Sequence, residues 1–328
     1  MCLSKNKNGN EWILKVENLK KYYKLYEKKN SYVNAVNNIN FKIYKGETLG
    51  LVGESGCGKT TVAKCITMLL KQYRGKIIFN NRGKEVVLNE NISSDLRFDI
   101  QMVFQDPFNS LNPRFTVKKI LEDPLINKKV FDRHEIVKRI EESLELVELD
   151  YSYFKKYPIE LTQGEQQRVG IARAFITDPK LVVLDEPTSL LDIHFRAEII
   201  NLLRKIQKER ETSYLFITHD LVAVSQLSKR ILVMYLGRIV EEGEVEDVFN
   251  SPLHPYTKAL FSAALFPDPF KKIKSISLKG EVPSPVNLPD NRCNLYQRCP
   301  MATDICLKSL PKLKEVKKGR FLACFHYH

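Results

Sequence analysis

The stretch ETLGLVGESGCGKT, from Glu47 to Thr60, joins an apolar strand to a glycine-rich loop and then to the start of a helix. Its second half, from Gly53 to Thr60, fits the pattern G-x-x-x-x-G-K-[ST] in the strand–loop–helix setting that this pattern requires. The glycines allow backbone N–H groups to surround phosphate oxygens, while Lys59 reaches the β- and γ-phosphates and Thr60 ligates Mg²⁺. The stretch therefore predicts a nucleotide-binding site in an α/β protein.

On both sides of this stretch, strand patterns alternate with helical patterns. The expected strands are residues 12–16, 40–44, 47–53, 75–80, 84–88, 100–104, 181–185, 214–219 and 230–236. The expected helices are residues 60–70, a helical region over 112–173 that is clearest over 136–149, 196–206, a segment near Leu221, and 255–264. This order predicts an α/β domain over residues 1–250 with a helical subdomain at about 108–173. Recurring prolines mark residues 251–328 as a C-terminal extension.

The composition is that of a globular protein without a membrane span. Hydrophobic residues make up 43% of the 328 residues, which is enough for a packed core. No segment reaches the ~18–20 uninterrupted apolar residues of a membrane span, and the N-terminal MCLSKNKNGNEW has no apolar signal segment. We therefore expect a soluble, cytoplasmic protein.

The net charge of +13 arises from 52 Lys and Arg residues against 39 Asp and Glu residues. Such a charge is compatible with a nucleic-acid partner or with a face near anionic lipid headgroups. The basic residues are spread along the chain, however, and no zinc-finger or RNA-recognition signature accompanies them. A lysine-rich solvated surface is the favoured interpretation, and no nucleic acid is expected.

Three other strands end in side chains that could carry chemistry. The run LVVLDE ends with Asp185, placed to hold Mg²⁺, and Glu186, which could polarise an attacking water. Gln105 follows IQMVF, and His219 ends YLFITH. Ligands of open α/β sheets bind beyond the carboxyl ends of the strands, where all of these residues and Gly53 lie. Taken singly, each could also be an ordinary strand end or surface residue.

The stretch LTQGEQQRVGIARA, from Leu161 to Ala174, predicts the start of a helix. Thr162 and Glu165 fit the S/T-x-x-E capping box. The first N–H groups of a helix are unpaired and its dipole favours negative charge, so this N-terminus is also a potential anion site. An ordinary capped helix is the alternative.

Six motifs occur in a fixed order along the chain: the phosphate-binding loop, QDP at Gln105, LTQGEQQR, LVVLDEP, SLLD at residues 189–192 and THD at His219. Over about residues 12–250 they resemble the ATPase subunit of ATP-binding-cassette (ABC) transporters. The resemblance implies a P-loop NTPase fold: a RecA-like core with an antiparallel β subdomain and an inserted α-helical subdomain. It also implies ATP and Mg²⁺ as ligands.

The resemblance assigns roles to individual residues. The implied ATP contacts are Tyr23, Gly53, Glu54, Ser55, Gly56, Cys57, Gly58, Lys59, Thr60 and Thr61, with Tyr22 as the rival of Tyr23 for stacking on adenine. The implied Mg²⁺ residues are Thr60, Gln105 and Asp185. In the implied chemistry Glu186 is the general base, His219 holds the γ-phosphate, and Gln105 senses Mg²⁺ and couples to the membrane subunit. Cys57 lies beside Lys59, an electropositive setting that should favour its thiolate, unless it is only a small inert residue.

LTQGEQQR resembles the ABC signature sequence, which in this family points at the ATP held by a partner subunit. The implied signature residues are Thr162, Gln163, Gly164 and Glu165, and Asp192 would belong to the contact between subunits. The usual SGGQ reads TQGE here. Gln163 adds bulk where phosphate should pass, and Glu165 brings a carboxylate; whether these changes weaken the partner's site stays open.

The C-terminal region narrows the resemblance. HPYTKAL at residues 254–260, PSPVN and RCPMATDIC resemble the extension of oligopeptide and dipeptide importer ATPases. VFQDPFNSLNPR and SAALFPDP resemble the second of the two paired ATPase subunits. The implied partners are a second, usually non-identical ATPase subunit, two membrane permeases and an extracellular or periplasmic substrate-binding protein. The chain would then lie peripherally on the cytoplasmic face of the cytoplasmic membrane.

Four of the seven cysteines fall in the last part of the chain: Cys293, Cys299, Cys306 and Cys324. Disulfides are improbable in a reducing cytoplasm, so this clustering indicates a metal site. The spacing C-x5-C-x6-C-x17-C differs from the close pairs of structural zinc sites and from ferredoxin runs. A [4Fe-4S] cluster is favoured, because similar importer tails are associated with one; zinc and free thiols are the alternatives.

The favoured function is ATP hydrolysis that powers peptide uptake. One alternative is a soluble ABC ATPase acting on nucleic acid or the ribosome, but such proteins typically carry two cassettes, a zinc insertion or a long coiled coil, none of which is present here. A regulatory scaffold is another, against which Lys59 and Glu186 argue. The substrate path belongs to other subunits, so nickel chelates and oligosaccharides remain possible cargoes.

Overall fold

The computed structural model describes residues 11–26, 30–81, 83–88, 93–129, 132–263 and 277–327. The chain divides into two compact units, which are described one at a time. The first unit comprises Met1–Ile13, Ile43–Thr48 and Asn89–Ile217. The second comprises Leu14–Lys42, Leu49–Leu88 and Thr218–His328.

The first unit contains a parallel β arrangement. Strand β7 (Leu181–Asp185) pairs on one side with β6 (Ile100–Val103) and on the other with β8 (Ser213–Ile217). Every residue of β7 and β8 is buried, as expected for continuous apolar runs in a sheet covered on both faces. Helix α7 (Ile193–Arg210) buries one side of its surface, and the Tyr214 hydroxyl donates to the Leu203 carbonyl at 3.1 Å. The α/β order expected from the sequence is confirmed.

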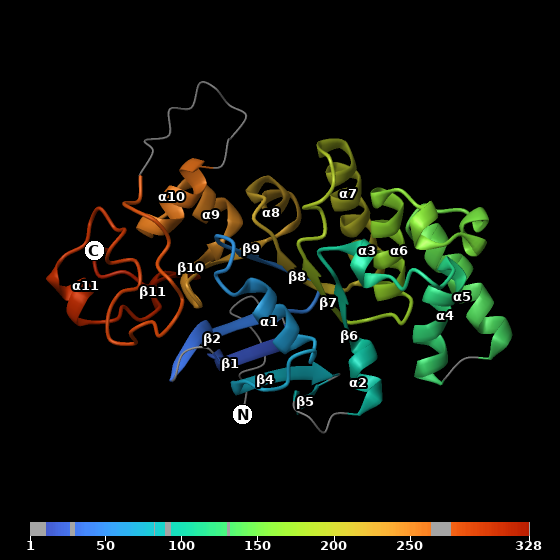
Figure 1. The fold of residues 1–328 in the computed structure, drawn as a ribbon, viewed down its shortest axis with the longest axis horizontal. Helices are drawn as coiled ribbons and strands as arrows, with labels where there is room; N and C mark the ends of the chain where they lie inside the picture. Colours follow the sequence, from blue (N-terminus) through green and yellow to red (C-terminus); the bar gives the residue numbers. More distant parts are fainter. Residues whose placement is uncertain are drawn as a thin grey trace. The chain divides into compact units, whose positions relative to one another are not determined.

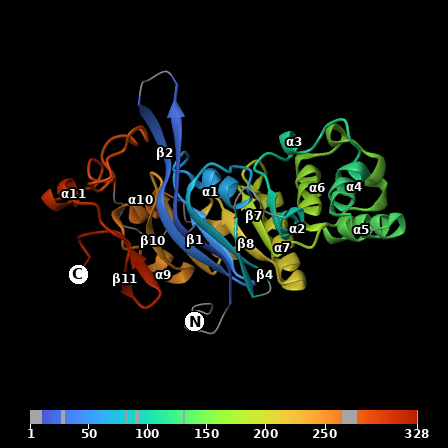
Figure 2. The same ribbon diagram turned by 90° about the horizontal axis from the view of Figure 1, so that it is seen from below.

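The same unit holds the helical insertion. Its main helices are α4 (Val117–Lys128), α5 (Arg133–Leu146) and α6 (Gln163–Phe175), with short α3 (Pro107–Ser110), η1 (Tyr151–Lys155) and η2 (Pro158–Glu160); the short helix α2 (Ser94–Asp99) precedes β6. Figures 1 and 2 both show α4, α5 and α6 side by side. Ile120, Ile140 and Val169 are buried on their inner faces, and the Ser143 hydroxyl donates to the Ala172 carbonyl at 3.1 Å. One apolar core therefore holds the insertion together.

The second unit contains an antiparallel sheet in the order β2-β1-β4-β5. Its strands are β1 (Trp12–Leu25), β2 (Ser31–Tyr44), β4 (Arg74–Asn81) and β5 (Lys84–Val87). Figure 2 shows the two long strands β1 and β2 running beside each other. The sequence predicts only the start of β1 and the end of β2, because polar residues such as Lys21, Asn34 and Asn37 are buried in the remainder of these strands. The expected antiparallel β subdomain is confirmed.

A further set of strands in the second unit leads to the phosphate-binding loop. Strand β3 (Thr48–Val52) is parallel to β9 (Arg230–Tyr235), and β9 is antiparallel to β10 (Arg238–Glu244). Helices α1 (Lys59–Ile66), α8 (Leu221–Leu227) and α9 (Val245–Asn250) belong to the same unit. Sequence patterns did not reveal β10 or α9, which follow a tight turn at Gly237 (φ 80°).

The C-terminal extension is more regular than the proline pattern predicted. It forms α10 (Pro255–Ala263), α11 (Asp304–Lys308) and a hairpin of β11 (Lys314–Lys317) and β12 (Arg320–Leu322), and β12 pairs with β10. The buried carboxylate of Glu241 on β10 accepts from Leu253 N and His254 N at 2.8 and 3.0 Å and pairs with Arg320. Figure 1 shows α9 and α10 together, and Phe249 packs on Phe261. Ala264, Cys2 and most of SAALFPDP lie outside the described residues.

Candidate functional site

The phosphate-binding loop leaves the end of β3, and Lys59 begins α1. Gly53 and Gly58 have φ of 156° and 110°, and a Cβ would lie 2.2 Å from the Met234 carbonyl oxygen at Gly53 and 2.0 Å from the Ala35 carbonyl oxygen at Gly58. Only glycine fits both positions, because the neighbouring backbone lies against the loop. The loop therefore has the shape expected of a phosphate cradle.

Lys59 is held by the loop itself. Lys59 is 5% exposed, and its Nζ donates to the carbonyl oxygens of Gly53 at 2.8 Å and Glu54 at 3.1 Å. A bound phosphate would have to compete with these two carbonyls for the ammonium group. Ser55, Gly56 and Thr60 are exposed at the surface of the loop, where a ligand can reach them; Thr61 is half-buried.

The expectation of a reactive thiolate at Cys57 is wrong. The side chain is 4% exposed and its Sγ lies 3.9 Å from Lys59 Nζ. Burial raises the pKa of the Cys57 thiol, and the positive charge of Lys59 offsets this only in part. Desolvation therefore wins over the electropositive setting, and Cys57 is a packed small residue whose carbonyl accepts from Gly237 N at 2.9 Å.

Tyr23 and Tyr22, the two candidates for stacking on adenine, differ in their contacts. The Tyr22 hydroxyl donates to Asn37 Oδ1 at 3.0 Å, and burial raises the pKa of that hydroxyl. Tyr23 is 38% exposed, with Lys21 Nζ 5.0 Å from its ring centre. Tyr23 thus presents a ring face that a base could reach, whereas the Tyr22 hydroxyl is already used within the sheet.

In the first unit, the end of β7 brings three of the expected residues together. Asp185 is 2% exposed at the last position of the strand. Glu186 follows with φ 47°, an uncommon conformation for a residue other than glycine, and its N–H donates to the Ile217 carbonyl at 2.8 Å. Gln105, after β6, donates to Glu186 Oε2 at 3.2 Å. Such backbone strain is concentrated at functional sites, and the hydrogen bond from Gln105 orients the carboxylate.

His219 belongs to the second unit and is exposed, directly before the N-cap residue Asp220 of α8. Asp220 accepts from Ala223 N at 3.1 Å, so the polypeptide around His219 is fixed by a capped helix. In the first unit, Asp192 is likewise a helix cap, accepting from His194 N and Phe195 N at the start of α7. These contacts show that Asp192 caps helix α7.

The capping box expected at the start of α6 is confirmed. Glu165 N donates to Thr162 Oγ1 at 3.3 Å, and Thr162 N donates to Glu165 Oε2 at 2.7 Å. The Thr162 hydroxyl also donates to Glu165 Oε2, and the Tyr153 hydroxyl donates to Glu165 Oε1. Partial burial raises the pKa of Glu165, but these hydrogen bonds outweigh it and hold that pKa below its usual value. Thr162 and Gln163 are exposed, whereas Gly164 is buried beside the Phe195 ring.

The four cysteines of the extension gather around one small cavity. Cys293 N donates to the Cys306 carbonyl at 2.9 Å, and Cys306 Sγ lies 3.4 Å from His326 Nε2. Burial raises the pKa of Cys293 to about 11 and raises the pKa of Cys299 and Cys324. Within the described part of the chain, no three His, Cys, Asp or Glu side chains have an arrangement that could hold a metal ion. His326 is a neighbour of the cysteines that the spacing argument missed.

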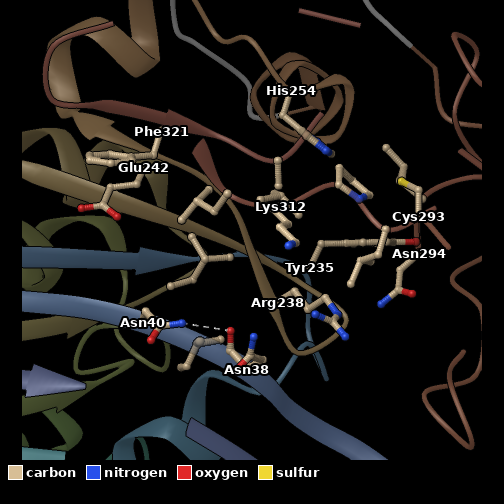
Figure 3. A pocket seen from close by; sticks show the side chains of 18 residues that line it. Asn38, Asn40, Tyr235, Arg238, Glu242, His254, Cys293, Asn294, Lys312 and Phe321 are labelled. Carbon is tan, nitrogen blue, oxygen red and sulfur yellow. Dashed lines mark hydrogen bonds between the residues drawn. The ribbon is translucent and has the colours of Figure 1, made fainter. Parts of the chain in front are cut away.

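A larger cavity of about 550 Å³ lies beside these cysteines in the second unit. Figure 3 shows side chains from β2, from the β9–β10 hairpin and from the extension facing it, among them Asn38, Tyr235, Arg238, Cys293 and Asn294. No motif indicated this cavity, because its walls come from segments that are far apart in the sequence.

Comparisons with known proteins agree with this geometry. The family model described as ABC transporter matches residues 36–189, and the one described as oligopeptide/dipeptide transporter, C-terminal region, matches residues 240–306. The oligopeptide transport ATP-binding protein AppF of Bacillus subtilis is 41% identical over 323 residues, covering 97% of this chain and 98% of AppF. OppF of Escherichia coli, also an oligopeptide transport ATP-binding protein, is 42% identical over 316 residues, covering 93% and 94%.

A solved structure extends the comparison to three dimensions. A dimeric ATP-binding cassette in a post-hydrolysis state, bound to ADP and Pi, is 31% identical with a TM-score of 0.62, covering 71% of this chain and 99% of that chain. As for membrane insertion, no helix among the described residues has the length and apolar character needed to cross a bilayer.

Proposed function

The chain belongs to the ABC transporter family, among the oligopeptide transport ATP-binding proteins, and we propose that it hydrolyses ATP to power the import of oligopeptides or dipeptides. The observation that carries the proposal is the glycine-dependent phosphate cradle at Gly53 and Gly58, present in one chain with a C-terminal region of the oligopeptide/dipeptide type. That C-terminal region favours transport over a soluble ATPase acting on nucleic acid or the ribosome.

The proposed division of labour follows the contacts of each residue. The loop N–H groups and Lys59 bind the phosphates, and the exposed ring of Tyr23 stacks on adenine. Glu186 accepts a proton from the attacking water, since the hydrogen bond from Gln105 orients its carboxylate. His219 binds the γ-phosphate from the loop before α8.

Mg²⁺ is the metal that such a site would use. The Thr60 hydroxyl, the Asp185 carboxylate and the Gln105 amide offer oxygen ligands, which Mg²⁺ prefers, and the low exposure of Asp185 suits an ion-paired carboxylate. The ion supplies charge neutralisation of the phosphate oxygens when bound.

The start of α6 is proposed to act on a nucleotide held by a second ATPase subunit. Thr162 and Gln163 are exposed at a helix N-terminus, where anions are favoured, and a related cassette has been solved as a dimer with ADP and Pi. The second subunit is proposed to be non-identical to this chain, and Asp192 to lie at the contact between the two.

The remaining partners are two membrane permeases and an extracellular or periplasmic substrate-binding protein. The proposal rests on the identity of the chain to oligopeptide transport ATP-binding proteins over nearly its whole length. In this arrangement the chain lies on the cytoplasmic face of the membrane, attached through the permeases. The ATPase would occupy residues 1–250, with the helical subdomain at about 108–173, and the extension residues 251–328.

For the extension, we favour a [4Fe-4S] cluster held by Cys293, Cys299, Cys306 and Cys324, with Zn²⁺ as the alternative. The gathering of all four thiols around one cavity supports the proposal, although their present arrangement is not that of a closed metal site. A bound cluster would hold the segments of the extension together through four iron–thiolate bonds.

Protein purified without oxygen should contain iron and sulfide at about four each per chain. Colourless protein with one zinc, or metal-free folded protein, would exclude the cluster.

The proposed function is tested by Glu186→Gln in the complex assembled with its permeases. The amide keeps the size of the side chain but cannot accept a proton, so MgATP should bind normally while turnover is abolished. The ATP-bound pair of ATPase subunits should then persist and be isolable. Retention of most of the wild-type hydrolysis rate would show that another group is the general base.

A further inference from the structure

The backbone and side chain of Glu54, in the phosphate-binding loop, are both bound by the C-terminal extension. Glu54 N donates to the Tyr256 hydroxyl at 2.8 Å. The Arg298 guanidinium donates to Glu54 Oε2 at 3.1 Å and to Oε1 at 3.4 Å. Tyr256 and Arg298 lie 202 and 244 residues away in the sequence, so the extension reaches the loop by two separate segments.

Tyr256 is rigidly placed. Its side chain is 0% exposed and packs on Tyr235 with ring centroids 4.6 Å apart. The start of α10 is fixed as well, because Tyr256 N donates to His254 Nδ1 and His254 N donates to the buried Glu241. The hydroxyl that accepts from Glu54 N therefore has little freedom to move away.

Arg298 is held in a similar way. Its side chain is 10% exposed, against 30% for Glu54, and the guanidinium also donates to the Tyr235 hydroxyl at 3.5 Å. Its backbone N–H donates to the Leu295 carbonyl at 2.9 Å, in the turn that connects Cys293 to Cys299. A partly buried, bidentate pair of this kind is stronger than a pair in open solvent.

Glu54, which the extension holds, in turn holds Lys59. Lys59 Nζ donates to the Glu54 carbonyl at 3.1 Å and to the Gly53 carbonyl at 2.8 Å. The N–H, the carboxylate and the carbonyl of Glu54 are therefore all engaged, the first two by the extension and the third by Lys59. Fixing the Glu54 peptide fixes the point from which Lys59 must reach a phosphate.

Charge gives Arg298 a second effect. Glu54 places a carboxylate in a loop whose ligand carries several negative charges, and an unpaired carboxylate there would repel the ligand. Arg298 neutralises that carboxylate. The Arg298–Glu54 pair thus favours anion binding by removing a repulsion, without touching the anion.

We propose that Tyr256 and Arg298 of the C-terminal extension are positioning residues for the phosphate-binding loop, setting its affinity for MgATP through Glu54. The inference rests on the proposed function in taking MgATP as the ligand. The extension then has a direct effect on the ATP site. An ordered turn between Cys293 and Cys299 holds Arg298 in place, and Arg298 in turn holds the loop through Glu54.

The test measures the Kd of MgATP for the purified full-length chain by calorimetry, together with the Tm without nucleotide. Tyr256→Phe removes one hydroxyl, Arg298→Ala removes the pair, and Arg298→Lys keeps the charge but not the bidentate geometry. Tyr151→Phe and Arg292→Ala are matched controls: the first alters an exposed ring on η1, and the second removes a charge from the same extension.

Loss of a hydrogen bond of ordinary strength predicts a Kd about three- to tenfold higher for Tyr256→Phe and for Arg298→Ala. Arg298→Lys should lie between wild type and Arg298→Ala, and both controls should match wild type.

A double-mutant cycle with Glu54→Gln separates positioning from general support of the fold. Arg298→Ala should raise the Kd clearly more in the wild-type background than in the Glu54→Gln background, because the neutral amide does not repel phosphate and only the hydrogen bond to its oxygen is lost. An equal effect in both backgrounds, or Kd values within about twofold of wild type for Tyr256→Phe and Arg298→Ala, would overturn the inference. If Arg298→Ala does not fold, Tyr256→Phe and Arg298→Lys decide by the same criterion. Absence of MgATP binding by the wild-type chain would instead refute the proposed function.

Discussion

Two buried side chains illustrate how far the chemistry of a single residue depends on packing. Cys57 was expected to be reactive because it neighbours Lys59, yet burial raises its pKa, since the loop packs against the β9–β10 turn. His254, in the HPYTKAL motif, is 2% exposed, and burial lowers its pKa to about 3. A local pattern places such residues along the chain but does not reveal their desolvation, which depends on segments distant in sequence.

His254 makes the stability of the chain sensitive to acid. In the folded protein its pKa is about 3, below the ordinary value of 6.5, so between these values the unfolded state binds a proton that the folded state does not. The contribution of the neutral His254 to the free energy of unfolding is therefore fully present above pH 6.5 and is lost as the pH falls toward 3. The expected decrease in the free energy of unfolding from pH 7 to pH 5 is about 2 kcal/mol from this residue.

Urea unfolding at a series of pH values measures this contribution. His254→Asn keeps an acceptor for Tyr256 N and should flatten the pH dependence. His194→Asn, at a histidine whose side chain is 83% exposed, should leave it as in wild type. Parallel pH profiles for wild type and His254→Asn would show that His254 does not titrate as described.

At the scale of elements, helix α6 begins with the capping box that the sequence predicts, and its first turn is also where the TQGE sequence departs from the usual SGGQ. The capping box was predicted from Thr162 and Glu165 alone, because it is a local motif, and both of its hydrogen bonds are present. The hydrogen bond from Tyr153 to Glu165 was not predictable, since η1 has no sequence signature. It adds a third donor, after Thr162 N and the Thr162 hydroxyl, that favours the ionised carboxylate at the end of the helix where a phosphate is proposed to bind.

Glu165→Gln should raise the ATPase rate of the assembled transporter. The amide can still serve in a capping box but carries no charge to repel a phosphate. A charge at close range in water is worth roughly 1 kcal/mol, so the increase should be up to about fivefold. The weaker cap should lower stability by about 0.5–2 kcal/mol.

Steady-state hydrolysis by the reconstituted complex is the measurement. Glu141→Gln, which removes the same charge from the exposed surface of α5, is the control and should leave the rate unchanged. Adding Gln163→Gly should increase the rate further if the bulk of Gln163 also obstructs phosphate. An unchanged rate in folded Glu165→Gln protein would show that the TQGE sequence is neutral.

At the scale of the whole molecule, the sequence predicted the order of elements and the family better than it predicted the extension. Apolar runs such as LVVLD define buried strands on their own, and the ordered motifs identify the ATPase. The contacts of Tyr256 and Arg298 with Glu54 join residues more than two hundred positions apart, and β12 pairs with the distant strand β10, so no local pattern encodes these interactions. Proline spacing suggested an irregular tail, whereas pairing with β10 and the buried Glu241 hold much of it in place.

The central claim is that ATP hydrolysis by this chain drives peptide import. Its most direct test is the uptake of a labelled oligopeptide by proteoliposomes that contain the chain, its partner ATPase, both permeases and the binding protein, with ATP supplied on the side of the ATPases. Uptake should require MgATP, should cease with Glu186→Gln, and should remain at the wild-type level with Glu141→Gln. ATP-dependent uptake that persists undiminished with Glu186→Gln, or hydrolysis by the wild-type complex without any peptide uptake, would contradict the account.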